Sequence, residues 1–247
     1  MSLKPKFSII TITFNAAKVI EPTLKSVREQ SYTNYEYLLI DGGSTDGTVA
    51  KAKASGIEFA HIVSERDNGL YDAMNKGIAL ATGDYLCFLN AGDAFHATDT
   101  LQGIVDAIAG ESELPHVLYG ETAEVDENRN FVRMRRLQAP ETLNWRSFKD
   151  GMLVCHQAFY ARRDIVPMYD LKYRLSSDVD WCIKVMKNSE KLVNVRMTVV
   201  DYLQNGLSLQ HHRASLIERF KVMSSHYGLL PTVARHLWFV IRAVIKK

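Results

Sequence analysis

The chain has 247 residues, of which 47% are hydrophobic and 23% charged, so it can bury the core of one large domain and is not a disordered protein. Thirty Lys and Arg against twenty-eight Asp and Glu leave a formal net charge of +2, which excludes a protein built chiefly to coat nucleic acid. Cys87, Cys155 and Cys182 are far apart and form no CxxC pair, so neither a disulfide framework nor a zinc cluster is expected.

The same features indicate a reducing compartment. No signal-peptide pattern follows the start MSLKPK, and no stretch reaches the roughly 18 uninterrupted apolar residues that a membrane span needs. We therefore expect a cytoplasmic protein, with peripheral contact to the inner face of the cell membrane as an open alternative for the tail.

The first hundred residues alternate between strand and helix patterns. Apolar runs predict strands over 7–14, 35–40, 57–64 and 85–90, while helical spacing predicts helices over 18–30 and 70–80 and another starting near Thr48. Strand, helix and strand at this spacing favour a right-handed parallel crossover, and hence an α/β protein. In such sheets ligands bind at the carboxyl ends of the strands.

The turn between strand and helix at 41–47, DGGSTDG, combines glycines with capping residues and suits either a plain turn or a ligand loop. The first strand continues into TFNAAK and lacks the GxGxxG of a dinucleotide site. This weakens a Rossmann-type oxidoreductase, which we keep as an alternative.

Three segments in this order, SIITITFNAAKVIEPTLKSVREQSY, LLIDGGSTDGT and DNGLYDAMNKGIALATGDYLCFLNAGD, resemble the nucleotide-binding half of glycosyltransferase family 2. The resemblance implies an inverting enzyme with the GT-A fold, a Rossmann-like and mostly parallel central sheet flanked by helices. It implies a GT-A domain over 1–212, with a nucleotide-binding half at 1–100 and an acceptor half at 101–212. A helical extension would follow at 213–247.

The resemblance also implies roles for single residues. Asp41 would accept a hydrogen bond from the base, and Asp93 would meet Mg²⁺ or Mn²⁺ on the diphosphate, although a turn-capping role is the alternative for Asp93. The expected nucleotide-binding residues are Thr13, Asn15, Asp41, Asp72, Asn75 and Asn90.

Two departures from the family pattern concern carboxylates. Gly42 stands where the family commonly has a second Asp after Asp41, and Asn90, Ala91 and Gly92 precede Asp93 where the family has Asp-x-Asp-Asp. One carboxylate can still serve Mg²⁺ if the diphosphate and water supply the other ligands.

The second half shows a looser pattern. We expect a helix over 99–109, a strand over 116–121 and polar excursions over 121–136, whose basic cluster Arg133, Arg135 and Arg136 is either a solvated face or a pocket wall. An apolar strand over 151–160 is interrupted by His156 and Gln157, which are either satisfied core residues or, by the resemblance, acceptor-side residues.

The helix predicted over 175–186 begins with serine caps and carboxylates in its first turn. It resembles the family's Glu-Asp-x-Asp helix with Ser177 in place of Glu, which assigns Asp178 as the general base and Asp180 as its acceptor-side neighbour. An inverting transfer needs one such carboxylate to take the proton of the acceptor hydroxyl.

The end of the chain combines a strand over 191–203, a polar loop over 204–213 and two helical stretches. In the loop, His211, His212 or Arg213 could supply a positive group at the diphosphate, although plain exposure explains them equally simply. Helix 214–227 ends at Gly228, and 229–247 has an apolar face beside cationic residues. That tail suits an anionic membrane surface or packing on the domain or on a second subunit, so a homodimer stays open.

These observations predict a metal-dependent inverting glycosyltransferase of the hexosyltransferase type. The donor would be a nucleoside diphosphate sugar, with UDP favoured, and the acceptor a saccharide or lipid-linked saccharide. The resemblance implies bacterial surface polysaccharide synthesis as the setting. The alternatives are a nucleotide-sugar-binding module without catalysis and the oxidoreductase named above.

Overall fold

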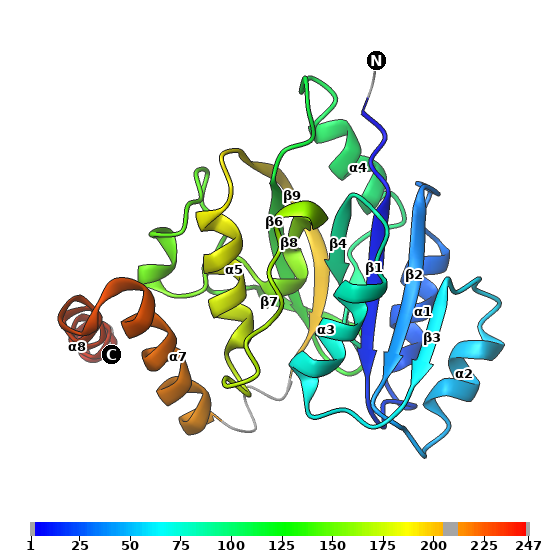
Figure 1. The fold of residues 1–247 in the computed structure, drawn as a ribbon, viewed down its shortest axis with the longest axis horizontal. Helices are drawn as coiled ribbons and strands as arrows, with labels where there is room; N and C mark the ends of the chain where they lie inside the picture. Colours follow the sequence, from blue (N-terminus) through cyan, green and yellow to red (C-terminus); the bar gives the residue numbers. More distant parts are fainter. Residues whose placement is uncertain (1–2, 205–211, 246–247) are drawn as a thin grey trace.

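A nine-stranded sheet in the order β3-β2-β1-β4-β8-β6-β9-β5, with β7 paired to β6, organises the computed structural model (Figure 1). The structure describes residues 3–204 and 212–245. The strands are β1 (Phe7–Thr13), β2 (Tyr35–Asp41), β3 (His61–Ser64), β4 (Tyr85–Phe88), β5 (Ala94–Phe95), β6 (Val117–Val125), β7 (Phe131–Met134), β8 (Phe159–Arg162) and β9 (Leu192–Leu203). The helices are α1 (Ile20–Arg28), α2 (Thr48–Ala54), α3 (Leu70–Leu80), α4 (Thr100–Ala107), α5 (Ser177–Lys187), α7 (His212–Tyr227) and α8 (Leu229–Ile245).

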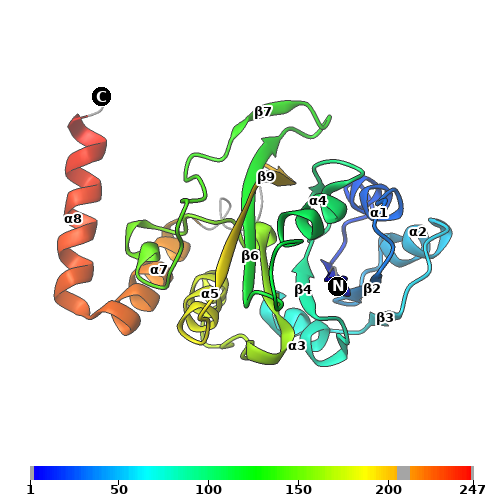
Figure 2. The same ribbon diagram turned by 90° about the horizontal axis from the view of Figure 1, so that it is seen from above.

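The first half of the sheet is parallel, as the crossover pattern predicts. β1 pairs with β2 from Phe7↔Tyr35 to Thr13↔Asp41 and with β4 on its other side, and every residue of β1 is buried. A strand with buried residues on both faces needs cover on both, which explains its continuous apolar run. Figure 2 shows α3 and α5 on one face of the sheet and α1 and α4 on the other.

The second half is mixed, because β8 runs antiparallel to both β4 and β6 while β9 runs parallel to β6. The carboxyl ends of β1, β2 and β4 and the N-terminal ends of α3 and α5 lie along the lower edge of Figure 1. The GT-A architecture expected from the sequence is confirmed, and this edge is where the candidate site must be sought.

Two expectations for the second half are wrong. The 121–136 stretch is not a series of excursions, because β6 extends to Val125 and turns back into β7 as a hairpin. The 151–160 stretch is not one strand, because a 3₁₀ turn, His156–Ala158, precedes β8. The turn moves the His156 and Gln157 side chains off the strand pattern, so both find polar partners.

The last two helices, α7 and α8, lie away from the sheet. α7 packs against α5, and α8 projects from the outer end of α7 at the left of Figure 2. None of the helices in the described ranges is both long and apolar enough to span a lipid bilayer.

Candidate active site

Asp41 ends β2 and is fully buried. Its Oδ2 accepts hydrogen bonds from the backbone N–H groups of Gly43 and Ser44 at 3.1 and 2.9 Å and from the Ser64 hydroxyl at 2.6 Å, and its Oδ1 contacts the Ser44 hydroxyl. The Asp41 carboxylate thus stabilises the 41–47 turn through hydrogen bonds to its backbone.

Two neighbouring strand ends carry buried polar atoms without a partner. Neither Thr13 Oγ1, at the end of β1, nor Asn90 Oδ1, just past β4, has a hydrogen-bond partner among the described residues. Since β1 and β4 are paired, both atoms lie at one edge of the sheet. Buried polar atoms normally have partners, so these two atoms are candidates for contact with a ligand.

Phe14 directly follows Thr13 and is 65% exposed, although it comes straight out of a buried strand. It lies against Gly42, since a Cβ built there would be 3.3 Å from the Phe14 ring. An exposed aromatic ring beside a strand end offers a stacking surface to a base, a feature that the sequence reasoning missed because Phe14 reads as the last residue of the strand.

The presence of Gly42, where the family commonly has a second Asp, also has a structural reason. A Cβ at this position would be 3.0 Å from Asp67 Oδ2, so the Asp67 carboxylate occupies the space that an Asp side chain at 42 would need. Asp67 is held there by Lys76, whose Nζ lies 2.5 Å from its Oδ1. The structure therefore supplies a second carboxylate from the loop after β3, which the strand-end pattern did not identify.

Other expected nucleotide-binding residues have structural partners. The Asn75 side chain accepts a hydrogen bond from the Tyr169 backbone N–H at 2.7 Å and donates one to the Tyr169 carbonyl at 3.1 Å. Asp72 accepts from the Asn68 backbone N–H at 2.9 Å ahead of α3, and Asn15 accepts from the Thr45 N–H at 3.0 Å. These three side chains shape the walls around the strand ends.

Asp93 lies in the turn after β4 and is 5% exposed. Its Oδ1 accepts from the Leu203 N–H at 3.0 Å and its Oδ2 from Gln157 Nε2 at 2.8 Å. Burial raises the pKa of Asp93 to about 7, although both hydrogen bonds and nearby Arg129 act in the opposite direction. Gly92, at φ 103°, supplies the left-handed backbone that this turn requires.

His156 and Gln157 point to different partners. The His156 ring packs against Phe88 and Trp181 and its Nε2 lies 2.6 Å from the Tyr169 hydroxyl. Burial lowers the pKa of His156 to about 4, so the ring is neutral near pH 7. Gln157 bonds to Asp93, which joins the segment before β8 to the turn after β4.

Asp178 and Asp180 lie on different sides of α5. Asp178 Oδ1 accepts from the Tyr71 hydroxyl of α3 at 3.1 Å and from the Val179 N–H at 2.9 Å, and no described residue bonds to its Oδ2. Asp180 is buried between His226 of α7 at 2.8 Å and Lys184 at 2.6 Å. Burial alone would raise the pKa of Asp180, but these two groups bring the pKa below its ordinary value.

Asp93 and Asp178 both lie in the surroundings of Cys155 and Tyr202. Both carboxylates help to raise the pKa of the Cys155 thiol and of the Tyr202 hydroxyl, with burial as the larger cause in each case. Arg135 acts on the same two groups in the opposite direction, whereas Arg133 pairs with Glu124. Of the basic cluster, Arg135 therefore lies near Cys155 and Tyr202, while the expected loop residues His211 and the rest of 205–211 lie outside the described residues.

Comparison with known proteins shows the family to which the chain belongs. The family model for glycosyl transferase family 2 matches residues 8–166. A PGL/p-HBAD biosynthesis glycosyltransferase of Mycobacterium bovis is 36% identical over 206 residues, covering 79% of this chain and 75% of that protein.

Two solved structures share the fold. The S. aureus TarS 1–349 complex with UDP-GlcNAc has a TM-score of 0.70 at 17% identity and covers 95% of this chain and 73% of that one. The mannosyltransferase PcManGT of Pyrobaculum calidifontis, in complex with GDP-Man and Mn²⁺, has a TM-score of 0.59 at 18% identity and covers 94% and 74%. The chain belongs to glycosyl transferase family 2 and is a glycosyltransferase.

Proposed function

We propose that the chain is a metal-dependent inverting enzyme that moves a hexose from a nucleoside diphosphate donor, with UDP favoured, to a saccharide or lipid-linked saccharide. The observation that carries this proposal is the Asp178 carboxylate at the start of α5, because the Tyr71 hydroxyl and the Val179 N–H hold its Oδ1 while its Oδ2 has no hydrogen-bond partner among the described residues. Residues 1–212 would form the catalytic domain and 213–247 its extension. Bacterial surface polysaccharide synthesis is the setting that we propose.

The donor base would lie at the ends of β1 and β2. Phe14 would stack on it, Asp67 would accept one of its N–H groups, and the unpartnered Thr13 hydroxyl would take a further bond. In this arrangement Asp41 acts indirectly, since its oxygens hold the loop that surrounds the base. The UDP-GlcNAc and GDP-Man complexes of the two structural neighbours support a nucleotide sugar as the ligand.

A divalent cation fits the oxygen donors beside the diphosphate position. Asn90 Oδ1 is buried and has no partner among the described residues, in the turn that ends at Asp93, and both side chains offer the oxygen ligands that Mg²⁺ and Mn²⁺ prefer. No group of three or more His, Cys, Asp and Glu in the described residues could hold a metal, so the diphosphate and water would complete the shell. When bound, the cation would neutralise the charge of the leaving diphosphate.

Asp178 would take the proton of the acceptor hydroxyl. The Tyr71 hydroxyl and the Val179 N–H hold one of its oxygens, which leaves Oδ2 for the incoming alcohol. Because the sugar would pass directly to that alcohol, on the side opposite the diphosphate, its anomeric configuration would invert. Gln157 would position Asp93, whereas buried His156 would support the acceptor side through Tyr169.

The test compares Asp178→Asn with the wild type. We expect kcat for transfer to fall by roughly 10²- to 10⁴-fold, because the amide cannot accept the proton. Calorimetry with UDP, GDP and NADH, each with and without Mn²⁺, should show UDP binding that the substitution leaves intact. Asp180→Asn is the matched control, and its main effect should be on stability.

Full transfer by Asp178→Asn would contradict the assignment of the base. Metal-stimulated UDP binding without transfer by the wild type, over a panel of nucleotide sugars and acceptors, would favour the alternative of a binding module that has lost catalysis. That alternative stays open because Asp93 is the one carboxylate where the family has Asp-x-Asp-Asp. Family membership already decides against a nicotinamide oxidoreductase.

A further inference from the structure

The charges of this chain are unevenly distributed. Residues 212–247 hold seven Lys and Arg and one acidic residue, whereas residues 1–211 hold twenty-three basic and twenty-seven acidic residues. The one acidic residue, Glu218, is turned toward the domain, where its carboxylate accepts from the backbone N–H groups of Arg174, Leu175 and Ser176. The extension is therefore cationic on a molecule whose remainder is slightly acidic.

α8 carries an apolar face that its own domain does not cover. Leu230 is 81% exposed, and Leu229, Val233 and Leu237, which share its side of the helix at three- and four-residue spacing, are 59%, 38% and 59% exposed. In the sequence, Val240, Ile241 and Val244 continue the same spacing.

Another side of the helix faces the protein. Thr232 is 1% exposed, and the His236 ring lies 5.1 Å from the ring of Phe220 on α7. The apolar face is thus not the surface by which α8 packs on α7, and Figure 2 shows the helix projecting from the domain. Packing on the domain, one of the arrangements left open by the sequence, does not account for this face.

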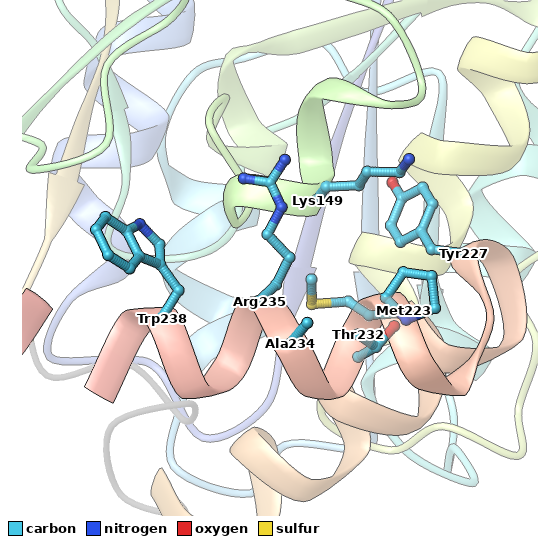
Figure 3. A pocket seen from close by; sticks show the side chains of 8 residues that line it. Lys149, Met223, Tyr227, Thr232, Ala234, Arg235 and Trp238 are labelled. Atoms are coloured by element: carbon cyan, nitrogen blue, oxygen red, sulfur yellow. The ribbon is translucent and has the colours of Figure 1, made fainter. Parts of the chain in front are cut away.

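A hollow of about 560 Å³ opens between α8, the end of α7 and the 3₁₀ turn Ser147–Asp150. Cationic and aromatic side chains line it together, and Figure 3 shows Lys149, Arg235, Tyr227 and Trp238 around it. Trp238 is 53% exposed, and Lys149 Nζ lies 5.5 Å from the centre of the Tyr227 ring. Cations and aromatic rings beside an apolar stripe are typical of segments at the headgroup level of a membrane.

We infer that α8 and this hollow form a docking surface for an anionic lipid membrane. The apolar face would enter the acyl boundary, while Lys149 and Arg235, whose guanidinium forms an ion pair with Asp150, would meet lipid phosphates. A bilayer fits better than a second copy of the chain, because a second copy would bring the same positive charge to the interface. Anionic headgroups instead complement it.

The test is co-sedimentation of the full chain with vesicles, without nucleotide. Vesicles of phosphatidylcholine with phosphatidylglycerol should bind the protein, vesicles of phosphatidylcholine alone should bind it at least about tenfold more weakly, and added salt should weaken the binding. Insertion should also shift the tryptophan emission to shorter wavelength, and Trp238→Phe should abolish that shift while Trp145 and Trp181 remain.

The variant Leu230→Glu/Leu237→Glu should lose vesicle binding by about tenfold or more. Its matched control is Phe131→Glu/Val132→Glu on β7, where the native side chains are 62% and 45% exposed, and this control should bind as the wild type does. Circular dichroism and thermal unfolding would show whether both variants are folded. If one variant does not fold, the lipid and salt dependence of wild-type binding still tests the proposal.

Two results would overturn the inference. One is equal binding to charged and uncharged vesicles, or none to either. The other is a dimer in sedimentation velocity that the α8 variant dissociates, without vesicle binding by the wild type, which would make the face a contact between two copies.

Discussion

Asp178 and Asp180 illustrate how two residues of the same type acquire different roles on one helix. Residues two apart on a helix do not face the same side. Asp178 therefore faces Tyr71 on α3, and Asp180 faces His226 on α7. The sequence resemblance favoured Asp178 as the base, and the contacts of Asp180 with Lys184 and His226 give an independent reason for that preference.

Phe14 gives the sharpest prediction at the scale of one residue. Phe14→Ala should weaken UDP binding roughly tenfold, because stacking of a base on an aromatic ring contributes about 1–3 kcal/mol. Calorimetric titration measures the loss. Phe131→Ala removes a side chain of nearly equal exposure, 62% against 65%, from β7 and not from the ends of β1 and β2, and should leave the affinity unchanged. Equal affinities for wild type and Phe14→Ala would remove Phe14 from the base site.

The elements of the first half could be predicted because their signals are local. α3 begins and ends where the sequence pattern places it, at Leu70 and Leu80, and β1 starts at Phe7 as expected. Because β1 is covered on both faces, its residues are apolar or small and uncharged, so one window of sequence contains the information. The same holds for α5, whose apolar face lies within one segment, although the expected serine caps are wrong: the Ser176 and Ser177 hydroxyls donate to the Ser215 and Asp170 carbonyls instead.

The segments that escaped prediction depend on distant partners. β7 has exposed residues and exists because it pairs with β6, and the 3₁₀ turn at His156 depends on Tyr169 and Asp93. Asp67 was missed for the same reason, since its approach to Gly42 follows from the path of the loop after β3. The local sequence of these segments contains no pattern that predicts such contacts.

The junction of α5 and α7 carries a prediction at the scale of elements. Glu218 accepts three backbone N–H bonds in the turn that leads into α5, at 3.0, 2.7 and 3.1 Å. Glu218→Gln removes the charge and one acceptor oxygen, so the free energy of unfolding should fall by about 1–3 kcal/mol. Urea denaturation measures it. Glu127→Gln, in the exposed β6–β7 turn, should change stability by less than about 0.5 kcal/mol.

At the scale of the whole molecule, the candidate site joins the two halves of the sheet. Asp93 follows the parallel half, while Gln157 and Leu203, which bond to it, belong to the mixed half. Asp93 and His156 are among the buried titratable groups of the site, and burial moves the pKa of each far from its ordinary value. Their effects on the stability of the whole chain have opposite signs.

Burial lowers the pKa of His156 to about 4, below its ordinary value of 6.5, so the unfolded chain binds a proton there first. Its contribution to stability is present above pH 6.5 and is lost as pH falls toward 4. Burial raises the pKa of Asp93 to about 7 from 3.8, so its contribution is present below pH 3.8 and is lost as pH rises toward 7. The effect reaches about 3 kcal/mol for His156 and about 4 kcal/mol for Asp93, and the two oppose each other between about pH 4 and 6.5.

We therefore expect a nearly level stability profile for the wild type between about pH 5 and 6.5, measured by urea denaturation with a chelator present. His156→Phe keeps an aromatic ring against Phe88 and Trp181 but cannot titrate, so the variant should become more stable as pH falls through this window. Asp93→Asn should do the reverse and lose stability as pH falls. Parallel profiles for the two variants would show that burial at this site does not shift the two groups in opposite senses.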